Sequence, residues 1–358
     1  SYPNWDFYSE QNDPSYFPDT GYSVLGSKKS AIIGYAMVNN YLATFKDEFD
    51  SERAVYIRQG ELIKNEYTNI YEPVFRIVNT LQGNGAVARY AFGNLLTEPL
   101  FLTRQGIYAI TPQDITGEKY SQNRSFYLDG ALENEEGLEN AIAIVFNDQY
   151  ILAINNKFYI LDGLQATRTD RSEPYATRQY AGFYCTNIPA FTMWVDEQAL
   201  WIGTEDGRVC RFSNDILNPD VYNDDGEAIY CCWETPDLDG RLFYKNKTFR
   251  YFALRMMSSW KTSFKLFAKK RGNWNFVKED KGTGIYFDFA HLDFEQWSFS
   301  TDRSNKVGHS KIRVKKVDKA RFRVENGELN ELFALVDLAL EYITSRSEER
   351  RVGKECRS

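Results

Sequence analysis

The sequence predicts an all-β protein in which a partial β-propeller is followed by a β-sandwich. Aromatic residues make up 16% of the 358 residues, and ring side chains suit the half-buried face of a strand. Short apolar runs alternate with polar turns, and no segment has the pattern of a long amphipathic helix. A strand–turn–strand unit recurs at intervals near 50 residues, which is typical of propellers with long blades.

Four segments contain this unit. Their first strands are marked by Tyr41, Leu100, Tyr150 and Leu200, so the successive steps are 59, 50 and 50 residues. A single blade cannot bury both of its faces, whereas blades packed around an axis cover one another. The alternative is a series of antiparallel sandwiches, which would share the density of strands but not the steady spacing.

The third unit illustrates the pattern. Tyr150, Leu152 and Ile154 alternate with their neighbours before a turn at Asn155 and Asn156, and the alternation then resumes. This is period-two patterning around a hairpin turn. Four units are few for a closed ring. Because the chain starts at Ser1 rather than at Met, we expect an N-terminal truncation, with further blades before Ser1.

A second region follows the stretch WETPDLDG, Trp233 to Gly240, where proline, aspartate and glycine indicate a linker. We therefore predict a propeller-like domain over residues 1–235 and a β-sandwich over 236–345. The sandwich strands include one in which Ile285, Phe287 and Phe289 share a face. The run LFALVDLALEY also tolerates a helix, but we predict a strand through Leu338, Leu340 and Tyr342.

The final stretch, RSEERRVGKECRS from Arg346 to Ser358, has dense mixed charge and no period. It resembles a translated sequencing adapter, so we interpret residues 346–358 as a non-native tail and the chain as a metagenomic fragment. An ordinary charged tail is the alternative. The adjacent Cys231 and Cys232 would point to opposite faces of a strand, so we expect reduced thiols and no disulfide between them.

The sequence offers no residue that we would name as catalytic, cofactor-binding or metal-binding. Its two histidines, His291 and His309, lie in no metal-spaced motif, and no nucleophile elbow, zinc-protease or phosphate-loop motif occurs. A glycosidase needs two carboxylates at a defined separation, and none of the 50 acidic residues is singled out. We therefore predict a protein that is not an enzyme, with a glycosidase as the alternative.

Two acidic stretches have simple structural interpretations. Asn223 to Glu227 could seat calcium, but Asp-Asp-Gly is also a strong hairpin turn, which we favour. The stretch LENEEGLEN from Leu132 is predicted to be a solvated loop. The seven tryptophans are spread singly and mostly on apolar strand positions, so core packing is the default, although an exposed platform would suit sugar binding.

One basic stretch stands out in a chain of net charge −7. Lys306 to Arg323 holds eight Lys or Arg residues and a single acid, Asp318. Lys311, Arg313 and Lys315 would share one face of a strand and form a basic ridge. The functional interpretation is a contact to an acidic partner subunit or to DNA in a tail channel. The alternative, which we favour, is an edge strand protected by lysines against unwanted pairing.

Several stretches resemble the β-propeller structural proteins of tailed bacteriophages, of the tail or head–tail connector type. They are Phe17 to Tyr35, Arg53 to Gly60, Leu200 to Val209, Tyr222 to Asp239 and Ala320 to Tyr342. The resemblance implies a non-enzymatic virion protein, such as a tail hub, nozzle or connector component, in a homo- or hetero-oligomeric assembly with other virion proteins.

That resemblance also implies a location in the virion, after a soluble stage in the host cytoplasm. No apolar run approaches the length of a membrane helix, so we expect no membrane segment. The alternative function is a carbohydrate-binding or glycan-cleaving propeller protein.

Overall fold

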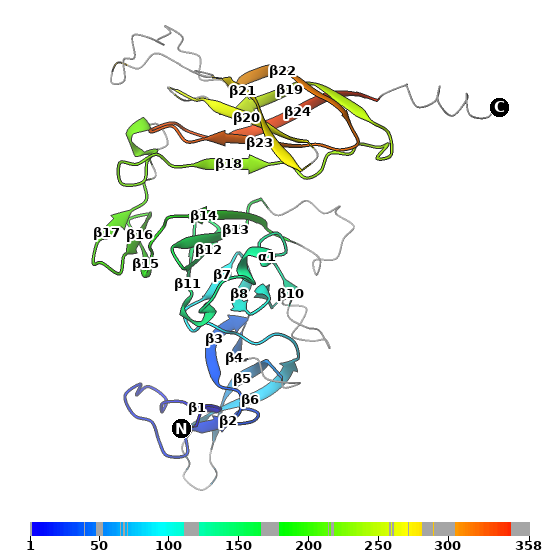
Figure 1. Ribbon diagram of the computed structural model, residues 1–358. Coiled ribbons are helices and arrows are strands. Elements are labelled where there is room, and N and C mark those ends of the chain that lie inside the picture. Colours follow the sequence, from blue (N-terminus) through cyan, green and yellow to red (C-terminus); the bar gives the residue numbers. More distant parts are fainter. Residues whose placement is uncertain are drawn as a thin grey trace, which may run out of the picture. The chain divides into compact units, whose positions relative to one another are not determined.

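The computed structural model describes residues 2–38, 40–47, 53–64, 66, 69, 71–110, 122–165, 179–213, 215, 218–257, 259, 261–270, 272–280, 289 and 305–344. These residues form two compact units, Ser1–Phe212 and Ser213–Ser358. Nearly all of the regular structure is β (Figure 1), and the one α-helix of the described part, α1 (Asp129–Leu132), is a single turn. No helix in this part is long and apolar enough to cross a membrane.

The first unit is a partial β-propeller made of four antiparallel meanders in chain order (Figure 1). The first sheet contains β3 (Ile32–Val38), β4 (Tyr41–Lys46), β5 (Val55–Lys64) and β6 (Tyr71–Leu81). The second contains β7 (Phe92–Leu95), β8 (Glu98–Thr103), β9 (Gly106–Ala109) and β10 (Gln122–Asn123). The third contains β11 (Ile142–Phe146), β12 (Gln149–Ile154), β13 (Lys157–Asp162) and β14 (Ala181–Thr186). The fourth contains β15 (Thr192–Asp196), β16 (Ala199–Gly203) and β17 (Val209–Arg211).

The hydrophobic cores of this unit lie between successive sheets. On β8, Phe101 belongs to a core shared with the first sheet, while Leu100 and Leu102 belong to a core shared with the third. On β12, Leu152 faces the second sheet and Ile151 faces the fourth. The first strands of neighbouring sheets also lie side by side, β3 with β7, β7 with β11 and β11 with β15. This is the packing of propeller blades.

The predicted hairpins are confirmed as the second and third strands of their sheets. Tyr41, Leu100, Tyr150 and Leu200 lie on β4, β8, β12 and β16. Asn155 and Asn156 both have positive φ, as a two-residue type I′ turn requires. A further strand precedes each hairpin, β3, β7, β11 and β15 respectively, and completes the inner side of its sheet.

The segment before β3 covers the face of the first sheet that points away from the second. This segment contains the short hairpin of β1 (Trp5–Phe7) and β2 (Tyr22–Val24). The fully buried Lys46 donates from Nζ to the carbonyl oxygen of Leu25 at 2.8 Å, and the fully buried Arg58 pairs with Asp6. The first sheet therefore has buried residues on both of its faces, apolar side chains on one and paired polar groups on the other.

The second unit is a β-sandwich of two sheets (Figure 1). One sheet has the order β18 (Cys231–Glu234), β23 (Arg321–Asn326), β20 (Phe264–Lys270) and β21 (Asn273–Asp280). The other has the order β22 (Lys306–Val317), β19 (Lys247–Met256) and β24 (Leu335–Thr344). Phe252, Leu266, Val314 and Phe322 lie in the single core between them.

Strand β24 confirms the predicted final strand, whereas the predicted domain boundary is too late in the chain. We expected residues up to 235 in the first domain, but β18 pairs with β23 and the units divide at Phe212. The Pro and Asp/Gly cluster after Glu234 marks the exit from β18 rather than a linker. The predicted strand around Ile285 and Phe287, His291 and the predicted non-native tail lie outside the described residues.

Candidate interaction surface

The buried charges of the first unit are used in structural pairs. Arg124 donates from Nε and Nη2 to the two carboxylate oxygens of Glu98, each at 2.9 Å, and Tyr180 donates to the same carboxylate at 3.0 Å. Both members of the ion pair are completely buried. A bidentate pair satisfies the directional donors of a guanidinium in a dry environment. These groups therefore fix the second sheet in place.

The predicted solvated loop after Leu132 is in part a buried contact. Glu135 accepts hydrogen bonds from Lys157 Nζ at 2.5 Å, Tyr159 Oη at 2.6 Å and Asn155 Nδ2 at 2.8 Å. Burial by itself raises the pKa of Glu135, but these three hydrogen bonds outweigh it and lower the pKa below its usual value. The prediction failed for Glu135 because its partners come from β13 and its preceding turn, which sequence spacing does not reveal.

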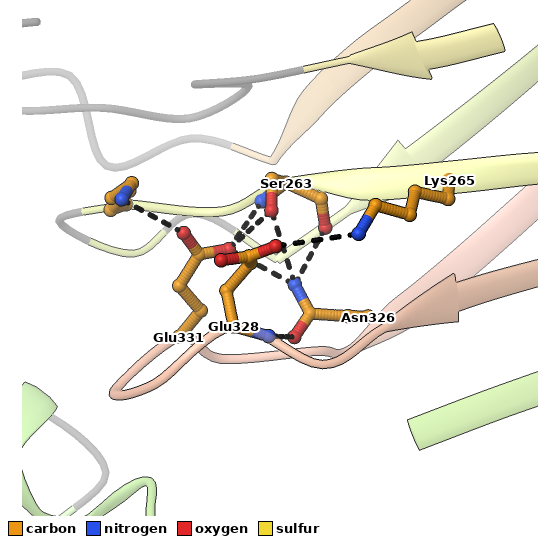
Figure 2. A network of polar contacts seen from close by, with 6 residues as sticks. Ser263, Lys265, Asn326, Glu328 and Glu331 are labelled. Atoms are coloured by element: carbon orange, nitrogen blue, oxygen red, sulfur yellow. Dashed lines mark hydrogen bonds and ion pairs between the residues drawn. The ribbon is translucent and has the colours of Figure 1, made fainter. Parts of the chain in front are cut away.

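A polar network in the sandwich joins the β23–β24 connection to the start of β20 (Figure 2). The buried Glu331 accepts hydrogen bonds from the Ser263 hydroxyl at 2.5 Å and from Asn326 Nδ2 at 3.0 Å. Lys265 and Glu328 form a more exposed pair beside it, at 3.5 Å. Ser263 and Asn326 thus share one acceptor, Oε2 of Glu331. The network holds the β23–β24 connection against the start of β20.

The basic ridge lies on β22 as predicted. Lys311, Arg313 and Lys315 are exposed, whereas Ile312 and Val314 are buried in the sandwich core. No acidic side chain in the described part of the chain forms an ion pair with the three cations of this ridge, Lys311, Arg313 and Lys315.

The neighbouring cations of the same basic stretch are paired. Lys319 and Arg321 both contact the carboxylate of Asp237 at 2.7 Å. These two hydrogen bonds lower the pKa of Asp237 to about 2. Arg323 contacts Glu325 at 2.5 Å. Among the described side chains of the basic stretch, the ridge and the adjacent Lys316 are the cations without an ion pair.

Among the described strands, β22 lies at one edge of a three-stranded sheet, as the edge-protection interpretation expects. Its pairing with β19 is regular from Tyr251, opposite Lys311, to Arg255, opposite Val307. It becomes irregular between Lys311 and Val317, where β22 carries extra residues relative to β19. Such bulges bend an edge strand and interrupt its pairing groups. His309 stacks on Tyr251, with ring centroids 4.8 Å apart, next to the ridge.

The acidic stretch from Asn223 to Glu227 forms a hairpin turn. Asp225 and Gly226 have positive φ, and Asp224 and Glu227 exchange backbone hydrogen bonds, so the predicted hairpin turn is confirmed. Within the ranges that the structure covers, no group of three or more His, Cys, Asp or Glu side chains could hold a metal ion.

The default of core packing is wrong for the described tryptophans, none of which is fully buried. Trp233 is exposed, and the other four pack on rings or cations. Trp194 stacks on Trp201 at 6.2 Å, and Arg323 lies 4.6 Å from the ring centroid of Trp274. The sequence pattern could not distinguish these positions because a tryptophan on an outer face alternates with polar neighbours just as an inner one does.

No protein-family model and no curated protein matches the sequence. Solved structures with some likeness include exo-beta-1,3-galactanase from Phanerochaete chrysosporium with galactose, at 11% identity and a TM-score of 0.21, over 93% of this chain and 72% of the galactanase. A second structure of that enzyme, with beta-1,3-galactotriose, gives 9% identity and a TM-score of 0.23, over 92% of this chain and 88% of the galactanase. At these scores the likeness carries no argument, so the sheets of the chain itself define its fold as a partial propeller with a sandwich.

Proposed function

We propose that this chain is a non-enzymatic structural component of the virion of a tailed bacteriophage, such as a tail hub, nozzle or connector protein. It would assemble with other virion proteins through exposed faces of its rigid β units. The virion setting comes from the resemblance of the five stretches described above, and the structure supplies the features that suit a scaffold.

One observation carries the proposal: buried charged groups are paired, whereas the ridge cations are exposed. Buried ionisable side chains such as Arg124, Glu98 and Glu331 are used to hold strands and loops together. The cations of the ridge form no ion pair with a described residue and stand instead in a row on a strand at the edge of the described sheet. Charges fixed in pairs stabilise one conformation, and a row of unpaired charges favours contact with a surface of opposite charge.

The setting can be tested by sequencing the DNA that flanks this reading frame and by mass spectrometry of purified virus particles from the same source. Portal, capsid or tail genes beside it, and its peptides in the particles, are the expected results. Polysaccharide-utilisation genes beside it, with no peptides in particles, would overturn the virion setting.

The carbohydrate alternative has its own test. Trp274 and Trp201 each have a cation over the ring, Arg323 and Arg211 respectively, so these indoles are already in use. A glycan array probed with the purified chain is therefore expected to give no specific signal. Saturable binding to one class of glycan would replace the scaffold proposal with a glycan-binding function.

A further inference from the structure

The sheet that carries the ridge is basic at one edge and acidic at the other. Strand β19 is central, with β22 on one side and β24 on the other. On the solvent face, the ridge lies on β22, and Asp337 and Glu341 lie on β24. Leu338 and Leu340 pack toward the core, so Asp337, just before this pair, and Glu341, just after it, lie on the outer face.

One pair of opposite charges at the two edges lies at the same level along the sheet. Tyr251 on β19 has Lys311 as its partner on β22 and Glu341 as its partner on β24. Arg255 similarly lies between Val307 and Asp337, and it forms an ion pair with Asp337 at 3.7 Å. Glu341 forms no ion pair within the described part of the chain. A second sheet placed beside the first without a shift would bring a lysine to the level of a free carboxylate.

Both edges also have a regular stretch whose outward backbone groups are not paired with another described strand. On β22 this stretch is Val307–Lys311, and on β24 it is Asp337–Glu341. Five residues is the length of an ordinary strand in a sheet. The irregular part of β22 beyond Lys311 limits backbone pairing to this stretch, while Arg313 and Lys315 add charge beside it.

We propose that the β22 edge of one copy docks against the β24 edge of a second copy of this chain. The inference rests on the proposed function, because it names a partner for the ridge. Pairing of two β22 edges would oppose lysine with lysine, and pairing of two β24 edges would oppose carboxylate with carboxylate. Like charges in direct opposition are unfavourable, so charge selects the mixed pairing.

The mixed pairing is head to tail. Strands β22 and β24 both run antiparallel to β19, so β22 of one copy continues the neighbouring sheet parallel to β24. Each copy keeps one free edge of each kind, and such heterologous contacts build rings or filaments rather than closed dimers. The exposed Val307, Val336 and Ile343 add apolar surface at the two edges.

The ridge also discourages a wrong pairing. Lysines on an edge strand oppose association with another basic edge, which is the protective role considered above. Edge protection alone predicts a monomer, whereas the proposed docking predicts concentration-dependent association that weakens with salt. The oligomeric state therefore separates the two.

The test uses the full chain in analytical ultracentrifugation and light scattering at low and at moderate salt. The wild type is expected to associate at low salt. The double variants Lys311→Glu/Arg313→Glu and Asp337→Lys/Glu341→Lys are each expected to weaken association by about tenfold or more, because each makes both edges alike in charge. An equimolar mixture of the two variants is expected to regain association, because the acidic edges of one then meet the basic edges of the other.

The matched control is Arg76→Glu/Arg104→Glu, which changes net charge by the same amount at exposed positions of the first unit. It should leave association unchanged, and circular dichroism should show that every variant is folded. A wild type that stays monomeric at its highest soluble concentration overturns the inference, as does a mixture that fails to regain association.

A labelled single-stranded oligonucleotide provides the remaining arm. The ridge would be a nucleic-acid contact instead of a contact to a second copy if the wild type is monomeric and binds the oligonucleotide, while the Lys311→Glu/Arg313→Glu variant does not bind it. These results are independent of flanking genes and glycan arrays. A monomer would leave the virion setting standing, and a glycan-binding protein could still associate through its edges.

Discussion

At the scale of single residues, charge in this protein is either fixed in pairs or gathered at an edge. Arg124, Arg58 and Lys46 are fully buried, and each has an acidic or carbonyl partner that the sequence separates from it by 20 residues or more. No spacing rule could have found these partners. The ridge, in contrast, could be predicted, because alternation along a single strand decides which side chains are exposed.

The pair of Arg124 with Glu98 gives a stability prediction. Arg124→Leu should lower the free energy of unfolding by about 3–5 kcal/mol, because it leaves Glu98 buried without a countercharge. Glu98→Leu/Arg124→Leu should cost clearly less, although the Tyr180 hydroxyl then lacks its acceptor. Urea denaturation followed by circular dichroism measures both. A double variant as unstable as the single variant would mean that the pair itself is a large net source of stability.

Asp237 gives a pH prediction. Its pKa is about 2 in the folded chain, because Arg321 and Lys319 donate hydrogen bonds to it, whereas an unfolded aspartate titrates near 3.9. The contact therefore adds stability above about pH 4, and this contribution is lost as the pH falls through about 2. Carboxyl NMR titration of the wild type should show the low pKa, and Arg321→Gln should raise it. A normal pKa in the wild type would show that the contact is absent in solution.

At the scale of elements, turns and inter-sheet contacts decide how well each blade forms. The hairpins were predictable because apolar alternation and turn residues act over a few positions. The bounds of the inner strands were not, since residues such as Phe92–Leu95 have little pattern of their own and are held by the neighbouring sheet.

Gly93 on β7 tests the contact between the second and third sheets. A Cβ added there would lie 2.8 Å from Val145 Cγ2 and 3.1 Å from the ring of the buried Tyr150. Gly93→Ala should therefore cost about 1–3 kcal/mol through overpacking. Gly130→Ala, in α1, is the matched control because nothing lies within 4 Å of its added Cβ. A thermal shift for Gly130→Ala as large as that for Gly93→Ala would contradict this account.

The turn between β15 and β16 is a place where the sequence can be improved. Glu197 and Gln198 both have positive φ, at 47° and 65°, in a turn that favours glycine at its second position. Gln198→Gly should raise the free energy of unfolding by up to about 1 kcal/mol, since glycine adopts a positive φ without the steric cost that a Cβ adds. Gln149→Gly, on β12, should instead lower the melting temperature. Equal effects of the two substitutions would argue against the turn geometry.

At the scale of the whole molecule, the sequence predicted two β domains in the right order but placed their boundary too late. The strand Cys231–Glu234 is short and exposed on most of its residues, so nothing in its own pattern says which sheet it joins. Only its pairing with β23, almost 90 residues later, assigns it to the sandwich. The candidate surface has the same limit: one edge was visible in the sequence, and the acidic edge opposite it was not.

The boundary can be tested with two fragments. Residues 213–345 contain every described strand of the sandwich and should fold and remain soluble. Residues 236–345 lack β18, so the edge of β23 is left open, and we expect aggregation. Size-exclusion chromatography and circular dichroism compare them directly. Equal behaviour of the two fragments would mean that β18 is dispensable to the sandwich.

The placement of each core between two sheets has a consequence for synthesis on the ribosome. The second sheet completes its apolar faces only after the third has been translated, and the third only after the fourth. During synthesis, the most recently translated sheet therefore exposes an apolar face until the next sheet has been made. Ribosome-associated chaperones are expected to bind this face. The first sheet is less exposed, because the segment before β3, which covers the face away from the second sheet, is translated before that sheet.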